Sequence, residues 1–530
     1  MLFTSYEFLL FLLIVFVIYY LIPSKWQWAF LLVASYVFYA IASPLYLIFI
    51  SVTGVTVYLA AVLMEDKSNK NAQYFKSVKA SLTREERKAL KSRQKRKVRN
   101  IFLASLLLNL GILAVLKYAN FTIVNINAML RTFGSNARLG RVDLILPMGI
   151  SFYTFQAVSY LIDVYNGRVK AQRNPFRLML FVSFFPQLVQ GPISRYGDLS
   201  QTLYGPHKAD KKNITFGLQR ILWGFFKKLV IADRILPGVK AIIAHPGKYD
   251  GEFAFIGMLF YALELYADFT GGIDITIGTA EVLGIRVQEN FIRPYFSKSI
   301  KEYWKRWHIS MGNWFTDYVF YPLSVSHALQ KLGRWSRKHL GNAVGKRVPV
   351  YLASFLVWLA TGIWHGAAWN FVAWGLGNFV IIMISQELEP LYLKFHESTH
   401  VEGKSWWKAI QILRTFLIMS CLRMFDCYRD VPLTFKMFGS MFTDFHITDL
   451  NASNFLSLGL GGFDYLVLAI AVILLFSVSM IQRSGSVREK IAARPYPVQC
   501  LIWAGLFLAV ILLGAYSVGY DASQFIYNQF

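Results

Sequence analysis

Charged residues are scarce in this chain of 530 residues, because Asp, Glu, Lys and Arg together make up only 16% of it. Soluble domains usually hold about a quarter. Hydrophobic residues make up 55% of the sequence, in runs that do not alternate as barrel strands do. The composition therefore excludes an ordinary soluble domain. It predicts an all-α polytopic membrane protein with about a dozen transmembrane or re-entrant helices.

Cysteine is also scarce, and this excludes two further classes of protein. Cys421, Cys427 and Cys500 lie in or beside hydrophobic runs and lack the spacing of metal ligands. They indicate neither a disulfide framework nor a metal site, so we expect no bound metal. The first residues also lack the basic segment and cleavage site of a signal peptide, and we expect a retained first helix.

Acidic residues are outnumbered by basic ones, 30 against 55, which gives a formal charge of +25. No nucleic-acid recognition module is visible, so we expect no nucleic-acid partner. The basic residues instead gather between apolar runs, above all in 65–100, with 13 Lys or Arg against 4 Asp or Glu. By the positive-inside rule the segments 65–100, 324–348 and 482–495 are cytoplasmic. Both chain termini are then expected outside the cell.

The apolar runs define the expected organisation of the chain. We interpret 1–530 as one integral membrane domain, with N-terminal helices in 1–142, a catalytic core in 143–390, and C-terminal helices with an aromatic tail in 391–530. The core mixes apolar residues with Pro, Gly and Gln. Broken helices at membrane depth need protein cover or a water-filled cavity. The expected spans are 6–22, 26–42, 44–64, 101–119, 252–277, 349–364, 369–387, 407–425, 463–481 and 497–518.

A single histidine, His365, lies in the apolar stretch "GIWHGAAWNFVAWG". The pattern predicts a turn at membrane depth over 362–369, between two helices. An ionisable group there is costly and is a functional hypothesis by default. The alternative is a neutral imidazole that bonds a carbonyl and stabilises the turn. A neutral imidazole is also what a general base requires.

A second histidine, His308, follows a basic stretch in "RPYFSKSIKEYWKRWHISMGNWFTDYVFYPL", residues 293–323. Helical spacing predicts an aromatic stripe beside a stripe that carries Lys301, Lys305 and His308. His308 would lie about 10 Å along the axis from Lys301. This arrangement suits a phosphate-bearing ligand whose reactive end reaches inward. The alternative is an interfacial helix whose lysines contact anionic lipid.

Several carboxylates also lie in apolar surroundings. Glu264 and Asp268 are four residues apart and share a helix face. Such a carboxylate pair at depth could form a proton relay or an ion site. We favour a second interpretation, in which they anchor the basic helix through Arg293 or Arg306.

Five motifs resemble the membrane-bound O-acyltransferase family and occur in the family's order between about residues 145 and 380. They are "LPMGISFYTFQAVSYLIDVY", "FFPQLVQGPISR", "YADFTGG", "NFIRPYFSKSIKEYWKRWHIS" and "GIWHGAAWNFVAWG". Within the family the chain resembles the bacterial branch that contains the alginate O-acetylase membrane component. The resemblance implies a helical bundle around a central tunnel, with His365 at its narrow point and His308 as the second family histidine.

The resemblance also implies a reaction. An acyl group, taken as acetyl from acetyl-CoA, passes from a cytoplasmic thioester to an extracytoplasmic polysaccharide. We expect His365 to act as general base and His308 to orient the donor or polarise its carbonyl. Lys301, Lys305 and Arg306 would receive the coenzyme phosphates. The expected setting is the bacterial cytoplasmic membrane, with lipid contacts, an extracytoplasmic SGNH-type acetyltransferase partner and no resident cofactor.

Three other functions remain open. D-alanyl transfer from a carrier protein to teichoic acid belongs to a close branch. A transporter would use Glu264, Asp268 and Asp274 as its ion pathway, but we find no paired halves. A scaffold for a polysaccharide synthase would leave both histidines without a role. The stretches "PLSVSHALQKLGRW" and "CLRMFDCYRDV" depart from the family pattern and leave the acceptor and partner open.

The chain closes on "DASQFIYNQF", which the charge pattern places outside the membrane. Its aromatic residues suit an interfacial belt. Alternatively the tail docks on a partner or at the tunnel mouth. The hydroxyl of Tyr527 could also accept the acyl group and hand it on.

Overall fold

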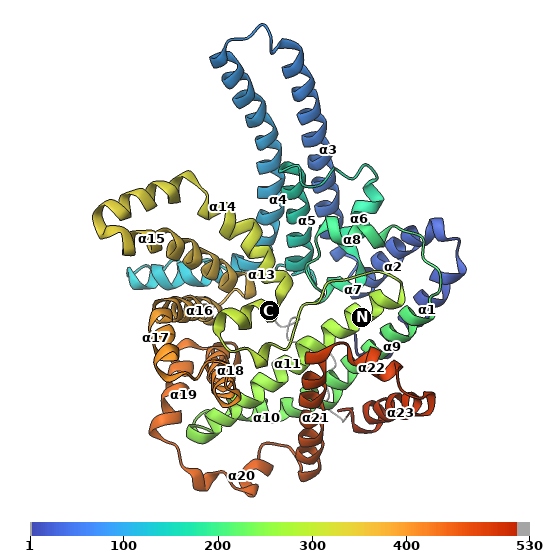
Figure 1. Ribbon diagram of the computed structural model, residues 1–530, viewed down its shortest axis with the longest axis vertical. Coiled ribbons are helices and arrows are strands. Elements are labelled where there is room, and N and C mark those ends of the chain that lie inside the picture. Colours follow the sequence, from blue (N-terminus) through green and yellow to red (C-terminus); the bar gives the residue numbers. More distant parts are fainter. Residues whose placement is uncertain (1–2, 517–530) are drawn as a thin grey trace. The chain divides into compact units, whose positions relative to one another are not determined.

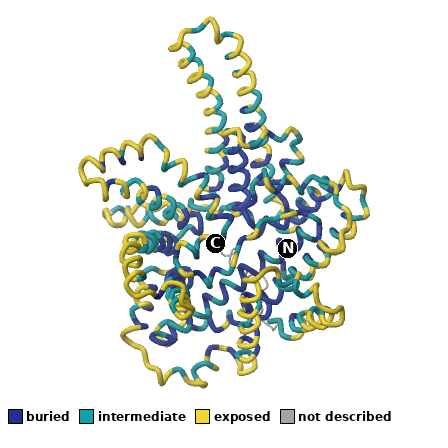
Figure 2. Tube along the Cα trace, viewed as in Figure 1, coloured by how far each residue is buried: buried dark blue, intermediate teal, exposed yellow. Residues whose placement is uncertain are grey.

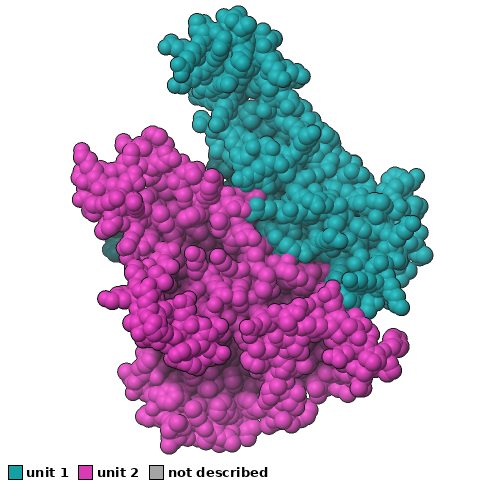
Figure 3. All heavy atoms as spheres, in the orientation of Figure 1, with its two compact units in different colours: residues 1–217, 279–288 teal, residues 218–278, 289–530 magenta. Residues whose placement is uncertain are grey.

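The structure is a computed structural model that describes residues 3–516, and within that part every regular element is a helix. The chain divides into two compact units, which Figure 3 colours separately. The first holds the chain up to Gly217 together with Thr279–Gln288, and the second holds Leu218–Gly278 and the chain from Glu289 onward. The predicted boundaries at residues 142 and 390, between the N-terminal helices, the core and the C-terminal helices, stay a prediction.

In the first unit, helix α5 lies against α3, α4 and α6. Nearly all of its side chains are buried. The helices up to the start of the second unit are α1 Tyr6–Leu21, η1 Ser24–Trp26, α2 Gln27–Ala42, α3 Tyr46–Val78, α4 Arg84–Thr132, α5 Ile150–Tyr165, α6 Pro175–Ser183, α7 Phe185–Leu188, α8 Tyr196–Leu203 and α9 Lys211–Phe225.

The basic segment 65–100 is a helical hairpin and not the loop that its charge suggested. Its Lys, Arg, Glu and Ala residues are strong helix formers, so α3 and α4 continue through it. Thr83 begins α4 with a capping box, in which its N–H donates to the Glu86 carboxylate over 2.8 Å. Figures 1 and 2 show the hairpin projecting with its outer half exposed. That this hairpin lies on the cytoplasmic side of the membrane stays a prediction.

In the second unit, α16 packs against α15 and α18, and α18 packs against α19. The expected basic loop 324–348 is also helical, and it joins the following apolar run across a kink at Gly341. The elements are η2 Phe226–Ala232, α10 Asp233–Ala244, α11 Gly251–Val282 (whose last residues belong to the first unit), η3 Pro294–Phe296, α12 Ile300–Arg306, α13 Ile309–Phe315, η4 Thr316–Phe320, α14 Tyr321–Ser324, α15 His327–His365, α16 Trp369–Glu387, α17 Glu389–Thr399, α18 Ser405–Tyr428, α19 Val431–Thr443, η5 Ile447–Asp449, α20 Ala452–Leu456, α21 Gly462–Ile481, η6 Gln482–Ser484, α22 Val487–Ala492 and α23 Tyr496–Leu513.

Six helices among the described residues are long and apolar enough to cross a membrane: α3, α4, α11, α15, α21 and α23. The count rises to seven if α16 and α17, which meet at a bend of 47°, form one span. Helices α1 and α2 have 16 residues each, fewer than the roughly 20 that a straight span needs. The protein is thus an all-helical, multi-pass membrane protein. The expected dozen spans and the central tunnel are not confirmed.

Candidate active site

His365 is the last residue of α15, and the break before α16 covers only 366–368, so the turn is shorter than the predicted 362–369. Glycines at the crossing allow α15 and α16 to approach each other closely. A Cβ on Gly362 would lie 2.5 Å from the Phe371 carbonyl oxygen, and a Cβ on Gly375 would lie 2.5 Å from that of Trp358. No larger residue fits these two positions without moving one helix. His365 is therefore held at the end of α15 by a tight helix crossing.

The segment that carries His308 is broken, so the continuous helical stripe expected within 293–323 is wrong. Helix α12 ends at Arg306 and α13 begins at Ile309, while His308 takes a left-handed conformation with φ 49°. A non-glycine residue with positive φ is uncommon, and such residues cluster at functional sites. The break redirects the imidazole away from the face that carries Lys301.

Asn290 holds this break in place from a neighbouring segment. Its backbone carbonyl accepts from the Ile309 N–H over 3.0 Å, and its side-chain oxygen accepts from the Ser310 N–H over 2.9 Å. The Ile292 N–H donates to the Arg306 carbonyl over 3.0 Å. These bonds satisfy backbone groups that the helix break would otherwise leave without partners inside the protein.

The two histidines meet around one indole. The ring centroids of His308 and Trp364 are 6.2 Å apart, and those of Trp364 and His365 are 5.1 Å apart. The indole of Trp374 lies 4.6 Å from His365 on the same measure. His308 is fully buried and His365 is 7% exposed. Two imidazoles, one at the end of α15 and one between α12 and α13, thus share one buried aromatic cage.

Arg423, on α18, completes the cage and was not among the expected site residues. Its guanidinium carbon lies 5.0 Å from the Trp307 ring and 4.9 Å from the Trp374 ring. It also pairs with Asp426 over 2.9 Å, and both side chains are buried. The signal in the sequence was two opposite charges three residues apart, inside the stretch "CLRMFDCYRDV" that departs from the family pattern.

The electrostatics of the cage keep His308 neutral. This residue lies outside the candidate spans, and burial, with Arg423 nearby, lowers the pKa of its imidazole to about 3. A neutral imidazole carries one N–H donor and one acceptor nitrogen. His308 is therefore suited to donate or accept a hydrogen bond but not to take up a proton near neutral pH.

The three basic residues expected at the donor phosphates lie outside this cage. Lys301 and Lys305 are exposed on α12. Arg306 is partly buried, and its guanidinium donates to Glu302 over 2.7 Å. The structure therefore brings together His308 and His365, and it leaves the lysines on an outer face.

The apolar carboxylates have partners other than those expected. Lys228 reaches Asp268 over 2.6 Å and Asp233 over 2.8 Å. Asp274 pairs with Lys227 over 2.6 Å and with Arg220 over 2.9 Å. The expected anchoring of the basic helix through Arg293 or Arg306 is wrong. The carboxylates hold α9 and η2 instead.

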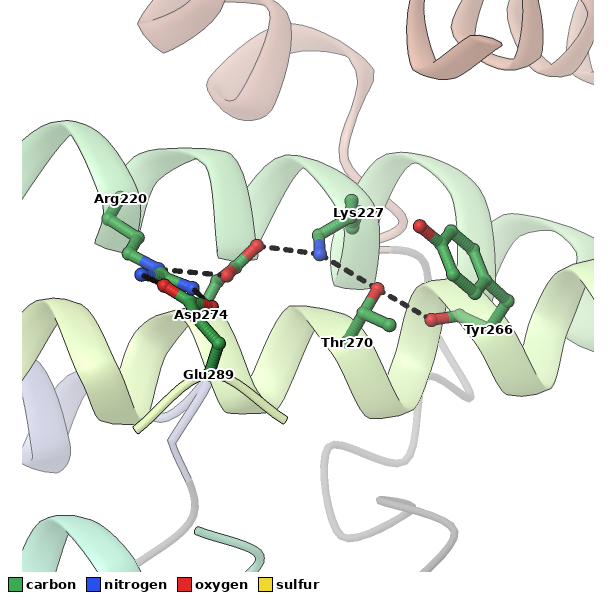
Figure 4. A network of polar contacts seen from close by, with 6 residues as sticks. All are labelled: Arg220, Lys227, Tyr266, Thr270, Asp274 and Glu289. Carbon is green, nitrogen blue, oxygen red and sulfur yellow. Dashed lines mark hydrogen bonds and ion pairs between the residues drawn. The ribbon is translucent and has the colours of Figure 1, made fainter. Parts of the chain in front are cut away.

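Figure 4 shows how this charge network is built. Lys227 also donates to the Thr270 hydroxyl over 2.7 Å, and Arg220 contacts Glu289 over 2.6 Å. Segment η2 is π-helical, and it buries the consecutive Lys227 and Lys228. Single-turn π-bulges are often found at functional sites.

Tyr527 lies outside the described residues, so its expected role stays a prediction. Within 3–516 no group of three or more His, Cys, Asp or Glu side chains is placed to hold a metal ion.

Residues 173–335 match the membrane-bound O-acyltransferase family. The chain is 33% identical over 376 residues to a probable alginate O-acetylase of Azotobacter vinelandii, which covers 70% of this chain and 68% of that relative. It is 30% identical to a peptidoglycan O-acetyltransferase of Helicobacter pylori, over 55% of this chain and 56% of the relative. It is also 30% identical to the teichoic acid D-alanyltransferase of Bacillus subtilis, over 52% and 67% respectively. On these similarities, the chain belongs to the membrane-bound O-acyltransferase family.

Proposed function

We propose that this protein is an O-acetyltransferase that takes acetyl from acetyl-CoA at the cytoplasmic face of a bacterial membrane and delivers it for O-acetylation of an extracytoplasmic polysaccharide. The observation that carries the proposal is the meeting of His308 and His365 around Trp364. The names of the Azotobacter and Helicobacter relatives support acetyl as the group transferred.

His365 is the proposed general base. Its neutral ring nitrogen takes the proton of the attacking hydroxyl as the oxygen bonds to the thioester carbonyl carbon. The carbon–sulfur bond then breaks, and the imidazolium returns the proton to the departing thiolate. The products are an O-acetyl ester and free coenzyme A, so the base is restored in each turnover.

His308 and Arg423 are proposed to stabilise the charge that develops on the carbonyl oxygen. Because the pKa of His308 is low, its imidazole is neutral and carries one N–H donor. Arg423 adds a fixed positive charge behind the indoles of Trp307 and Trp374. Donors and charges that are already in place act strongly in a site from which water is excluded.

The donor and acceptor sides are proposed from chemistry and charge. Exposed Lys301 and Lys305 lie on the outer face of α12, where they can pair with the coenzyme phosphates. Arg306 donates to the Glu302 carboxylate, so it could bind the phosphates only after that contact is broken. We place the hairpin 65–100 in the cytoplasm and both termini outside, by the positive-inside rule.

An extracytoplasmic SGNH-type acetyltransferase is the proposed partner, and Tyr527 is the proposed docking or relay residue. Tyr527→Phe keeps the ring and removes only the hydroxyl. A relay predicts that this variant loses polymer acetylation, whereas docking alone predicts near-normal acetylation. Deleting 524–530 then tests docking itself.

D-alanyl transfer is the alternative, favoured by the similarity to the Bacillus subtilis enzyme. A transporter is disfavoured, because Asp268 and Asp274 are already paired with lysine and arginine side chains and so are poorly placed to bind a mobile ion.

The test compares His365→Ala, His308→Ala and the control His339→Ala in cells and in lipid vesicles. His339 is exposed on α15, so its removal should leave activity unchanged. Loss of a general base typically lowers the reaction rate by about 10²–10⁴-fold. We expect this fall for His365→Ala, both in the release of thiol from acetyl-CoA and in the acetylation of the polymer. Wild-type acetylation by His365→Ala would refute the base assignment. Consumption of a D-alanyl carrier protein in place of acetyl-CoA would establish the alternative.

A further inference from the structure

A cavity in the second unit lies beside the histidine cage. Its volume is about 600 Å³, within the range of small-molecule sites. Segments α9, η2, α11, α21, α22 and α23 contribute to its walls, together with residues between 289 and 293. The acyl transfer proposed above assigns no ligand to this cavity.

Phe291 is the wall residue that contacts His308. Its side chain is half-buried and lines the cavity, and its ring centroid lies 6.4 Å from that of the fully buried His308. The same ring packs against Phe269 at 4.8 Å and Trp307 at 5.0 Å between centroids. One aromatic side chain therefore borders both the cavity and the imidazole that is proposed to polarise the donor carbonyl.

The backbone at Phe291 is fixed, whereas its ring can turn. The carbonyl of Asn290 and the N–H of Ile292, on either side of Phe291, each bond the segment around His308 over 3.0 Å. The ring can therefore move only by rotation between staggered rotamers. The neighbouring cavity offers the space into which it would turn. These are the properties of a side-chain gate.

The polar part of the wall suits a coenzyme thioester. The Nε atom of Arg293 and the Nε1 atom of Trp503 are buried and have no hydrogen-bond partner among residues 3–516. Buried donors usually have partners, and the amide and phosphate oxygens of coenzyme A are acceptors. The acidic lining residues, Asp274 and Glu289, are already paired with cations in the network of Figure 4. They would therefore add little repulsion toward an anionic ligand.

The position of the cavity along the chain favours the donor over the acceptor. Gly485, Ser486 and Arg488 line it, and they belong to the segment 482–495 that the positive-inside rule places in the cytoplasm. The coenzyme lies on that side of the membrane, whereas the polysaccharide lies on the other. The walls thus include both the cytoplasmic segment and the neighbour of His308.

We propose that the cavity receives the thioester arm of an acyl-coenzyme A and that Phe291 is the gate at its inner end, which turns aside to let the thioester carbonyl reach His308. The inference rests on the acyl transfer proposed above. A closed gate keeps water out of the cage, which prevents hydrolysis of the donor. With the ring removed, the oxygen of a water molecule can bond to the carbonyl carbon while His365 takes its proton. The carbon–sulfur bond then breaks, the proton passes to the thiolate, and acetate and coenzyme A are released.

The first experiment measures acetate release and polymer acetylation by the full chain in lipid vesicles with acetyl-CoA. Phe291→Ala should raise the ratio of acetate released to acetyl transferred at least about tenfold, because water then enters the cage. Phe291→Tyr keeps the ring and should keep the wild-type ratio. Phe296→Ala should also keep it, because that ring packs against Phe476 at 5.5 Å and does not line the cavity.

The second experiment tests occupation of the cavity without any turnover. Ser479 lines the cavity, whereas Ser477 lies two residues away on α21 and does not. Each is replaced by cysteine in a full chain whose three native cysteines are alanine. Acetonyl-CoA, a thioether analogue that cannot transfer its acetyl group, should slow alkylation of Ser479→Cys by N-ethylmaleimide several-fold. It should leave the alkylation of Ser477→Cys unchanged.

The outcomes separate this inference from the proposed function. An unchanged ratio in folded Phe291→Ala, or an equal rise in Phe296→Ala, would refute the gate. Equal alkylation of Ser479→Cys with and without acetonyl-CoA would remove the donor from the cavity, and it also decides the matter if Phe291→Ala does not fold. Either result leaves the proposed function intact, since that function fails only if the wild type transfers no acetyl from acetyl-CoA to polymer.

Discussion

The ion pair between Arg423 and Asp426 is the most informative place to perturb the candidate site. Both side chains are buried, their charged atoms are 2.9 Å apart, and the guanidinium packs against the indole of Trp374, which lies beside His365. Removing one partner of such a pair leaves an uncompensated buried charge, which typically lowers the free energy of unfolding by about 3–5 kcal/mol.

The two single variants should differ in magnitude. Asp426→Asn removes the carboxylate beside Arg423, but three indoles lie within 6 Å of that guanidinium, and each cation–π contact offsets about 0.5–2 kcal/mol. We expect a loss of about 3 kcal/mol. Arg423→Met leaves the buried Asp426 carboxylate without its arginine and without a comparable aromatic contact. We expect the free energy of unfolding to fall by about 5 kcal/mol.

The double variant Arg423→Met/Asp426→Leu completes the cycle. It removes both charges and fills the space with apolar groups, a change that is often neutral or stabilising. Stability is measured by denaturant unfolding in mixed micelles, and activity by acetyl-CoA consumption. A double variant as unstable as the sum of the two single variants would refute the pair as an energetic unit. A stable double variant with full activity would refute the proposed role of Arg423 in charge stabilisation.

Three further predictions address the helix crossing, the sidedness and the donor contacts. Gly362→Ala forces a Cβ to within 2.5 Å of a carbonyl oxygen on α16, so unfolding free energy should fall by about 1–3 kcal/mol and acetylation with it. Gly439→Ala, with open space at its Cβ, is the control, and equal stability of the two variants would contradict the crossing argument. Single cysteines placed in 65–100 should resist an impermeant maleimide in intact cells, and ready labelling would reverse the topology. Charge reversal at Lys301 and Lys305 together should raise the KM for the donor more than it lowers kcat, whereas an unchanged KM would favour lipid contact.

The starts of several apolar helices were predictable from the apolar runs, because a helix in lipid must be long and apolar. Helices α11, α16 and α21 begin within a few residues of their expected positions. Charge in the basic segments was misleading about structure. Lys, Arg and Glu are strong helix formers, and once α3 leaves the apolar region nothing in its sequence stops it before Val78.

Sequence reasoning selected both histidines, which the structure brings together, but it did not predict their geometry. Periodicity assumes a continuous helix, so it could not place the left-handed His308, whose conformation depends on bonds from the distant Asn290. For the same reason it assigned the wrong cation to Asp268: Lys228 comes from another segment, and a π-helix gives no periodic signal in the sequence.

Both candidate histidines lie where a helix stops, and this follows from the constraints of an apolar environment. A continuous helix satisfies its own backbone groups, but it directs its side chains outward in a fixed spiral. Two imidazoles on intact neighbouring helices could therefore meet only at the point where the two helices cross. At a helix end or a left-handed residue the side chain can turn toward a shared point, provided that the broken backbone is covered. Asn290 supplies that cover for His308, and the close packing around Gly362 supplies it for His365. The residues that support the breaks should therefore be as necessary for acyl transfer as the histidines themselves.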